Sequence, residues 1–206
     1  MKYLLLLSLT TSLLFAKVAG FVALGLGYDE DIYETKGEVV PSGLAIIRHE
    51  NIAIEGNRIS YNMTRASLLN IALIARAQDE LLDLGLQLTL PLPADFRFQI
   101  NSFSDISNYG YALEGMIFRR FSVSNLELVP SIALEHNSKD RTQFLYALPI
   151  KSVHLEAELL TIYNISKRYN LASTLFYNLY DKDVLQNSLI QSRERWRFSI
   201  GVGYRF

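Results

Sequence analysis

The chain has 206 residues, a formal net charge of −1 and no cysteine. Its 20 basic and 21 acidic residues nearly balance, so the charge excess typical of nucleic-acid-binding proteins is absent and no nucleic-acid partner is expected. Without cysteine, disulfides and thiolate metal sites are excluded, and three histidines make a zinc centre a poor expectation. We therefore expect no metal and no cofactor.

The amino terminus has the pattern of a secretory signal peptide. A short positive start precedes an almost unbroken apolar run over residues 3–16. This run is shorter than the roughly 20 residues that a transmembrane helix needs, which disfavours an inner-membrane anchor. We predict a signal peptide over 1–16, with cleavage as late as residue 20 as an alternative, followed by one domain over 17–206.

The rest of the chain shows repeated alternation of apolar with polar or small residues, which is typical of β-strands. Twelve Tyr and eleven Phe also favour strands and membrane interfaces. The predicted strands cover residues 21–28, 39–49, 51–63, 67–77, 84–90, 96–101, 109–118, 126–135, 142–148, 152–163, 168–180 and 196–206. Ten strands are the alternative, because the segments 51–63 and 142–148 alternate poorly.

Three local features qualify this pattern. Pro130 lacks an amide hydrogen and predicts a bulge in its strand. Leu160 and Ile162 break the alternation of 152–163, which indicates either a bulge or a partly apolar interior. With twelve strands, the long polar connections 29–37 and 181–194 fall on one side, as the extracellular loops of an outer-membrane barrel do.

The carboxyl-terminal strand is the most informative segment. Its polar or small residues alternate with large apolar ones, so one face suits a lumen and the other suits lipid. A terminal strand that ends on an aromatic residue resembles the signal by which bacterial barrels are recognised for insertion. The residues that carry this predicted signal are Trp196, Phe198, Ile200, Val202, Tyr204 and Phe206. We therefore predict an all-β, transmembrane antiparallel β-barrel in the bacterial outer membrane.

The inward positions of the predicted strands carry charges of both signs. Mutual pairing across a narrow interior costs less than leaving each charge bare in a low dielectric. We therefore expect a packed lumen and no wide aqueous pore. The predicted polar network consists of Arg97, Glu114, Glu127, Glu135, His154, Glu156, Glu158, Arg168, Arg197 and Arg205.

A catalytic interpretation of this network is weak. His154 and Glu156 lie two residues apart on one strand face and could orient a general base, but no nucleophile is located beside them. A structural polar pair held by an arginine is the favoured interpretation, and we expect no enzymatic activity. The acidic run Asp29 to Asp31 is similarly interpreted as a solvated loop, with cation bridging to lipopolysaccharide phosphates as the alternative.

Five short motifs resemble the MipA/OmpV family of outer-membrane proteins. They are L-G-L-G-Y at 24–28, V-V-P-S-G-L at 39–44, D-I-S-N-Y-G-Y at 105–111, L-V-P-S-I at 128–132 and G-V-G-Y-R-F at 201–206. The resemblance implies a non-enzymatic scaffold of the Gram-negative envelope that links murein synthesis and hydrolysis to the outer membrane. Its implied partners are a periplasmic murein transglycosylase or synthase, beside membrane lipid and lipopolysaccharide.

Two other functions stay open at this point, a small-solute channel and a surface adhesin. A periplasmic partner would contact turns at the periplasmic end. With the predicted strand limits, these are residues 49–51, 78–82 and 137–141.

Overall fold

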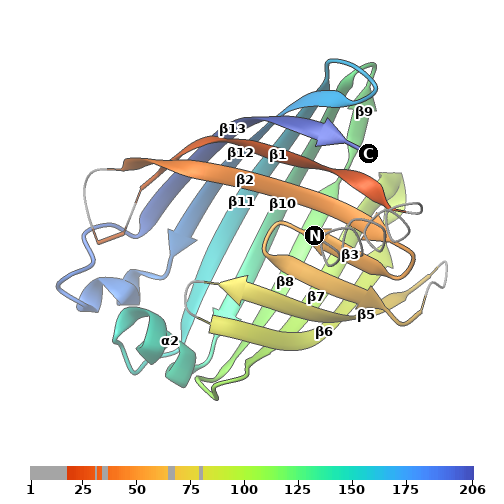
Figure 1. Ribbon diagram of the computed structural model, residues 1–206. Coiled ribbons are helices and arrows are strands. Elements are labelled where there is room, and N and C mark those ends of the chain that lie inside the picture. The colour runs from red at the N-terminus through yellow and green to blue at the C-terminus, as the bar shows by residue number, and fades with distance from the viewer. Residues whose placement is uncertain (1–17, 31, 34–36, 65–67, 79–80) are drawn as a thin grey trace, which may run out of the picture.

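The computed structural model describes residues 18–30, 32–33, 37–64, 68–78 and 81–206, so the predicted signal peptide lies outside the described residues. The described strands form one antiparallel sheet that closes into a barrel (Figure 1). Among these residues, no helix is long and apolar enough to cross a membrane. The elements are β1 (Ala19–Asp29), β2 (Glu38–His49), β3 (Ile52–Glu55), β4 (Arg58–Asn62), β5 (Asn70–Gln78), β6 (Leu81–Pro91), η1 (Pro93–Asp95), β7 (Phe96–Asp105), β8 (Tyr111–Arg119), β9 (Phe121–Val123), β10 (Leu126–Asn137), α2 (Lys139–Tyr146), β11 (Ser152–Asn164), β12 (Tyr169–Tyr180), η2 (Lys182–Gln186) and β13 (Glu194–Arg205).

The barrel has twelve strands. Strands pair with their chain neighbours around the ring, and β13 pairs with β1, from Phe21 opposite Arg205 to Asp29 opposite Arg197. Because β8 and β9 both pair with β10, they are two parts of one interrupted strand, so the thirteen β elements make twelve barrel strands. The predicted closed antiparallel barrel is confirmed.

Two of the predicted strands are wrong, and their errors cancel in the count. The segment 51–63 is a hairpin of two short strands, β3 and β4, because Gly56 adopts a φ of +60° and turns the chain. The segment 142–148 is not a strand but belongs mostly to helix α2. Ser138 begins this helix, since its side chain accepts a hydrogen bond from the Arg141 amide at 3.4 Å.

The bulge expected at Pro130 is also wrong. Pro130 lies opposite Leu159 in an unbroken register with β11. On the other side of β10, Ser131 pairs with Phe118 and Leu128 pairs with Phe121, so neither strand holds an extra residue. The missing amide hydrogen instead interrupts the ladder and separates β8 from β9.

The outward face of the barrel is apolar and is bordered by aromatic residues. Between the two ends, leucines such as Leu24, Leu84 and Leu86 project outward and stay half exposed. Tyr28 and Trp196 project outward near one end, and other tyrosines do so near the opposite end. Paired aromatic belts around an apolar band are typical of a barrel that crosses a membrane.

The two ends of the barrel differ, and we call them the loop end and the turn end. The loop end carries the long connections between β1 and β2, between β10 and β11 and between β12 and β13, including α2 and η2. The turn end carries the start of β1, the end of β13 and short connections such as 50–51 and 124–125 (Figure 1). The predicted placement of the two long loops on one side is confirmed.

The predicted set of partner-facing turns needs a correction. Only 49–51 lies at the turn end, whereas 78–82 and 137–141 lie at the loop end. The reason is the β3–β4 hairpin, which adds a strand before β5 and reverses the direction of every later strand up to β10.

Candidate functional site

The lumen contains a cavity of about 1000 Å³ on its loop-end side. Inner faces of β1, β2, β12 and β13 form one wall, and β4, β5, β8 and β10 form the other. Charged side chains of both signs line it together with aromatic residues from the strands and from α2. This cavity and the polar groups around it are the candidate site.

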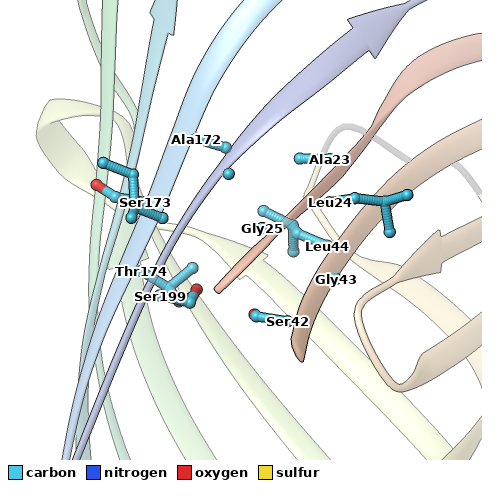
Figure 2. A pocket seen from close by; sticks show the side chains of 12 residues that line it. Ala23, Leu24, Gly25, Ser42, Gly43, Leu44, Ala172, Ser173, Thr174 and Ser199 are labelled. Atoms are coloured by element: carbon cyan, nitrogen blue, oxygen red, sulfur yellow. Dashed lines mark hydrogen bonds between the residues drawn. The ribbon is translucent and has the colours of Figure 1, made fainter. Parts of the chain in front are cut away.

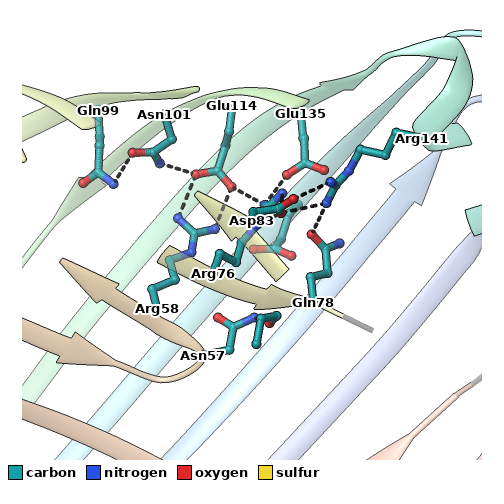
Figure 3. Close-up of polar contacts among 12 residues, drawn as sticks. Asn57, Arg58, Arg76, Gln78, Asp83, Gln99, Asn101, Glu114, Glu135 and Arg141 are labelled. Carbon is teal, nitrogen blue, oxygen red and sulfur yellow. Dashed lines mark hydrogen bonds and ion pairs between the residues drawn. The ribbon is translucent and has the colours of Figure 1, made fainter. Parts of the chain in front are cut away.

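A network of buried charges forms one side of the cavity (Figure 3). The Arg58 guanidinium donates two hydrogen bonds to the Glu114 carboxylate, at 2.8 and 2.7 Å. The Asn101 amide donates a third, to Glu114 Oε1 at 2.5 Å. Glu114 is 3% exposed, so its charge is neutralised by protein groups and hardly by water.

Arg76 lies at the centre of this network. Its Nη2 is 3.0 Å from Asp83 Oδ2, its Nη1 is paired with Glu135, and Glu114 Oε2 lies 3.7 Å from Nη1. The guanidinium also stacks over Phe103, 3.8 Å from the ring centroid. One buried cation is therefore surrounded by three carboxylates and an aromatic face.

Arg141 ties helix α2 to the barrel wall. Its Nη1 and Nη2 donate to the two Asp83 oxygens at 2.7 and 2.9 Å, and Nη2 also donates to Gln78 Oε1 at 3.3 Å. Both Arg141 and Asp83 are fully buried. The network thus contains three arginines and three carboxylates and is charge-balanced.

The strand register explains why the network crosses the lumen. Arg58 lies opposite Arg76 on β4 and β5, and Glu114 lies opposite Glu135 on β8 and β10. Each of these neighbouring like-charge pairs is unfavourable alone. Because β5 and β10 are separated along the barrel by three strands, their charges pair across the interior and join β4 and β5 to β8 and β10.

The opposite wall carries small residues (Figure 2). Ser42, Thr174 and Ser199 project inward there, and the hydroxyls of Thr174 and Ser199 lie 2.6 Å apart. Gly25 and Gly201 face each other in the β1–β13 ladder, where a Cβ on Gly25 would overlap the backbone of Ile200 and Gly201. Small side chains therefore leave the cavity open on this side.

Apolar side chains fill the lumen toward the turn end. Phe21, Leu160 and Ile162 are at most 8% exposed and pack with Ala23 and Ala172 into one cluster, the lumen floor. Leu160 and Ile162 lie in regular register with β12, so their break in alternation reflects a partly apolar lumen and not a bulge.

Three loops pack together at the loop end into a cap. Ile32, Tyr146, Val184 and Ile190 form its buried apolar cluster. The Tyr33 hydroxyl donates to the Leu145 carbonyl at 3.0 Å, which joins the first loop to α2. The cavity therefore lies between the cap and the lumen floor.

Most of the predicted network residues face the lumen, but they form separate groups. Glu114 and Glu135 belong to the central network. Glu156 lies 4.0 Å from Arg197, on the opposite side of the cavity. Glu127 accepts a hydrogen bond from Arg205 at 3.2 Å near the turn end.

The remaining predicted residues are more scattered. Arg168 is a correction, because it lies exposed in the turn between β11 and β12, where its amide donates to Ser166. Arg97 is exposed near the turn end of β7. Glu158 lies beside Leu160 on the lumen face of β11, and the His154 ring lies 5.5 Å from that of Tyr180.

The predicted network did not include Arg58, Arg76, Asp83 or Arg141, which form the centre of the observed one. Arg58 is the first residue of β4, Asp83 is the third residue of β6, and Arg141 lies in a segment where a turn was predicted. For Arg58, the turn-forming Gly56 was the available signal, because it makes Arg58 the first residue of a separate strand.

The predicted insertion residues share the outward face of β13. The side chains of Trp196, Phe198, Ile200, Val202, Tyr204 and Phe206 are 40–59% exposed. The acidic loop is only partly described: Asp29 binds Arg195 through two hydrogen bonds at 3.0 and 2.9 Å, and Asp31 lies outside the described residues. Among the described residues, no cluster of His, Asp and Glu has the form of a metal site.

No known protein family and no curated protein matches the chain. Solved structures do match. A structure described as NanC porin superposes with a TM-score of 0.52 at 10% identity, covering 90% of this chain and 100% of that one. An anion-selective porin from Comamonas acidovorans superposes with a TM-score of 0.53 at 9% identity, covering 92% of this chain and 98% of that one.

These identities establish the fold and not the solute. The long connections lie at one end of the barrel, and the short turns lie at the other end together with the start of β1 and the end of β13. This arrangement assigns the loop end to the extracellular side. The apolar outer band, the aromatic belts and the porin-like fold agree. The protein is a twelve-stranded β-barrel of the bacterial outer membrane.

Proposed function

We propose that this barrel is a non-enzymatic, gated conduit for small polar solutes. The observation that carries the proposal is the cavity of about 1000 Å³ inside the lumen, which has the size of a small-molecule site. The lumen floor packs between this cavity and the periplasmic end of the barrel, and we infer that it has to move for a solute to pass.

The charges around the cavity favour solutes of low net charge. Arg195 and Arg197 line one side, and Asp29 and Glu156 lie next to them as ion-pair partners. Because the cations and anions balance, a zwitterionic or neutral polar solute finds partners for both of its ends. The likeness to solved porins supports a conduit, although the anion selectivity of one of them belongs to that protein.

The scaffold function implied by the MipA/OmpV resemblance stays a prediction, as do family membership, a murein-enzyme partner and contact with lipopolysaccharide. The adhesin alternative stays one too. The conduit has more support because it uses the cavity, whereas the other two functions need surfaces alone. Co-purification with murein transglycosylases tests the scaffold independently.

Conductance in planar bilayers tests the conduit and its gate. We expect no steady large conductance from the natural chain. Replacing Phe21 and Ile162 by alanine removes bulk from the lumen floor and should raise the conductance several-fold. The matched control replaces Leu24 and Val202, which project to lipid on β1 and β13, and should change nothing. A folded floor variant that conducts no better than the control contradicts the proposal.

Ion selectivity provides a second readout in the floor variant. With balanced charges, the reversal potential in a salt gradient should lie near zero. Arg197→Gln removes a cation from the cavity wall and should shift selectivity toward cations. An unchanged reversal potential would mean that permeating ions do not pass this wall.

A further inference from the structure

The barrel wall is incomplete between β2 and the β3–β4 hairpin. β2 pairs with β1 over its whole length, from Ala19 opposite Arg48 to Asp29 opposite Glu38. On its other edge it pairs with β3 only from His49 to Ile46, and the last contact is the Gly56 amide donating to the Ala45 carbonyl at 2.9 Å. No described strand pairs with this edge over residues 38–44 (Figure 1).

The direction of the backbone identifies the unpaired groups. In an antiparallel sheet, every second residue of a strand directs its backbone amide and carbonyl toward the same neighbouring strand. Since the Ala45 carbonyl points to β3, the backbone groups of Gly43, Pro41 and Val39 point into the gap. Pro41 has no amide hydrogen to leave unpaired, and proline is tolerated at such free edges.

The gap opens onto the lumen cavity. The residues that border it also line the cavity: Val40 to Leu44 on β2, Gly56 to Arg58 at the hairpin tip, and Gln78 at the end of β5. A Cβ placed on Gly56 would meet no atom within 4 Å, so the hairpin tip faces open space. The cavity therefore reaches the outside of the barrel sideways, beneath the cap.

The gap lies at the depth of the outer leaflet. Across the β1–β2 ladder, Gly43 pairs with Leu24 and Pro41 pairs with Leu26, and both leucines project into the apolar band. Tyr28, in the aromatic belt above them, pairs with Val39. The described residues show no partner for the amides and carbonyls of this edge. Hydrocarbon cannot satisfy such groups, whereas a polar head group or water can.

We propose that this gap is a lateral opening through which single-chain amphiphiles with a zwitterionic head pass between the lumen cavity and the outer leaflet. The head group occupies the cavity, where Arg58 and Arg197 supply cations and Glu156 supplies an anion. The hydrocarbon chain lies in the gap against the apolar band. The inference rests on the proposed conduit function, because both need a cavity that admits solutes.

A second polypeptide is the competing occupant of the edge. A β-strand from another copy would need continuous donors along β2, and Pro41 removes one of them. The glycine next along the edge, Gly43, also has no side chain to pack against such a strand. A membrane amphiphile is therefore the better fit.

The experiment uses the protein in bilayers with one engineered cysteine, because the natural chain has none. A fluorophore on Ser42→Cys reports from the lumen face of β2 beside the gap. The probe is lysophosphatidylethanolamine with a nitroxide on its head group, and nitroxide-labelled phosphoethanolamine without the chain is its polar counterpart. We expect saturable quenching by the lysolipid from the membrane.

Closing the gap provides the decisive variant. This variant inserts eight residues of alternating Thr and Val, four on each side of Gly56–Asn57. The insertion lengthens the hairpin by about 13 Å along β2. The matched control carries the same insertion at the turn Ser124–Asn125. We expect the extended hairpin to weaken lysolipid quenching at least tenfold and the control insertion to leave it unchanged. If the extension fails to fold, Gly43→Trp obstructs the gap from the lipid side.

The outcomes separate this inference from the conduit itself. If the polar counterpart quenches and the lysolipid does not, the lateral opening is wrong and the conduit stands. If neither quenches, both are wrong. Lysolipid quenching that survives closure of the gap overturns the inference, since the lipid then enters elsewhere. Disulfide-linked dimers of Val39→Cys in bilayers would also overturn it, because a second copy would then cover the edge.

Discussion

The two sides of the lumen follow the same alternation of residues but use it differently. On the side of β4, β5, β6, β8 and β10, inward positions carry arginines and carboxylates that pair across the interior. On the side of β12, β13, β1 and β2, the inward positions in the middle of the strands are mostly serine, threonine, glycine and alanine, and the charged residues Asp29, Arg195 and Arg197 lie nearer the loop end. The first side is held together by charge, and the second leaves space.

This difference shows how a narrow barrel combines stability with a cavity. A buried charge network is costly to leave incomplete, so it fixes the distance between the strands it joins. Small side chains on the facing wall then keep part of the lumen unfilled. Substitutions on the two sides should therefore have different consequences.

The largest effect is expected at the centre of the charged side. Arg76→Ala leaves Asp83, Glu135 and Glu114 without their shared cation and should lower the free energy of unfolding by about 3–5 kcal/mol. Urea unfolding from lipid vesicles measures it. Arg48→Ala is the control, since its pair with Glu55 is exposed and should contribute at most about 1 kcal/mol. Equal effects of the two substitutions would remove the distinction between the sides.

The next effect concerns the outer face rather than the lumen. Leu86→Arg places a charge in the apolar band and should destabilise the folded barrel by about 2–4 kcal/mol in the same vesicles. Gln87→Arg, one residue later on the lumen side of β6, should cost clearly less. If the lumen substitution is the more damaging of the two, the assignment of faces is wrong.

A smaller effect is expected where the cap meets the charged side. Arg141→Met removes the two hydrogen bonds to Asp83 and should cost about 1–3 kcal/mol. Because Asp83 keeps its bond to Arg76, the barrel should still fold. Protease should cleave the 138–151 loop of the folded variant faster than that of the natural chain. Lys139→Met, on the exposed face of α2, should leave the cleavage rate unchanged.

The smallest effect is expected at the strand interruption. Pro130→Val restores an amide donor opposite the break between β8 and β9 and should stabilise the barrel by roughly 1 kcal/mol or less. Thermal unfolding in detergent measures the change. A clear loss of stability would show that the interruption has another cause.

The sequence predicted the parts of the fold in which local alternation decides the structure. β1, β6 and β13 have the expected faces, because each places large apolar residues on one side only. The hairpin at Gly56 and the helix at Lys139 were missed, since their short segments carry little periodicity. Those two errors reversed the middle strands without changing the strand count.

The candidate site was less predictable than the fold. Glu114 and Glu135 were expected in the lumen, but their partners Arg58 and Arg76 depend on strands that meet only across the closed barrel. Arg76 and Glu135 lie far apart in the sequence, and pairing between such distant residues leaves no local sequence pattern. The gap beside β2 was likewise invisible until the length of the hairpin was known.

One accessibility scan along β13 tests the central claim, that alternate residues face lipid and lumen. Single cysteines from Trp196 to Tyr204, each carrying a spin label, are exposed in bilayers to oxygen and to a water-soluble nickel complex. We expect oxygen accessibility to peak at every second position, at Trp196, Phe198, Ile200, Val202 and Tyr204. Uniform accessibility to the nickel complex along the strand, with no period of two, would contradict it.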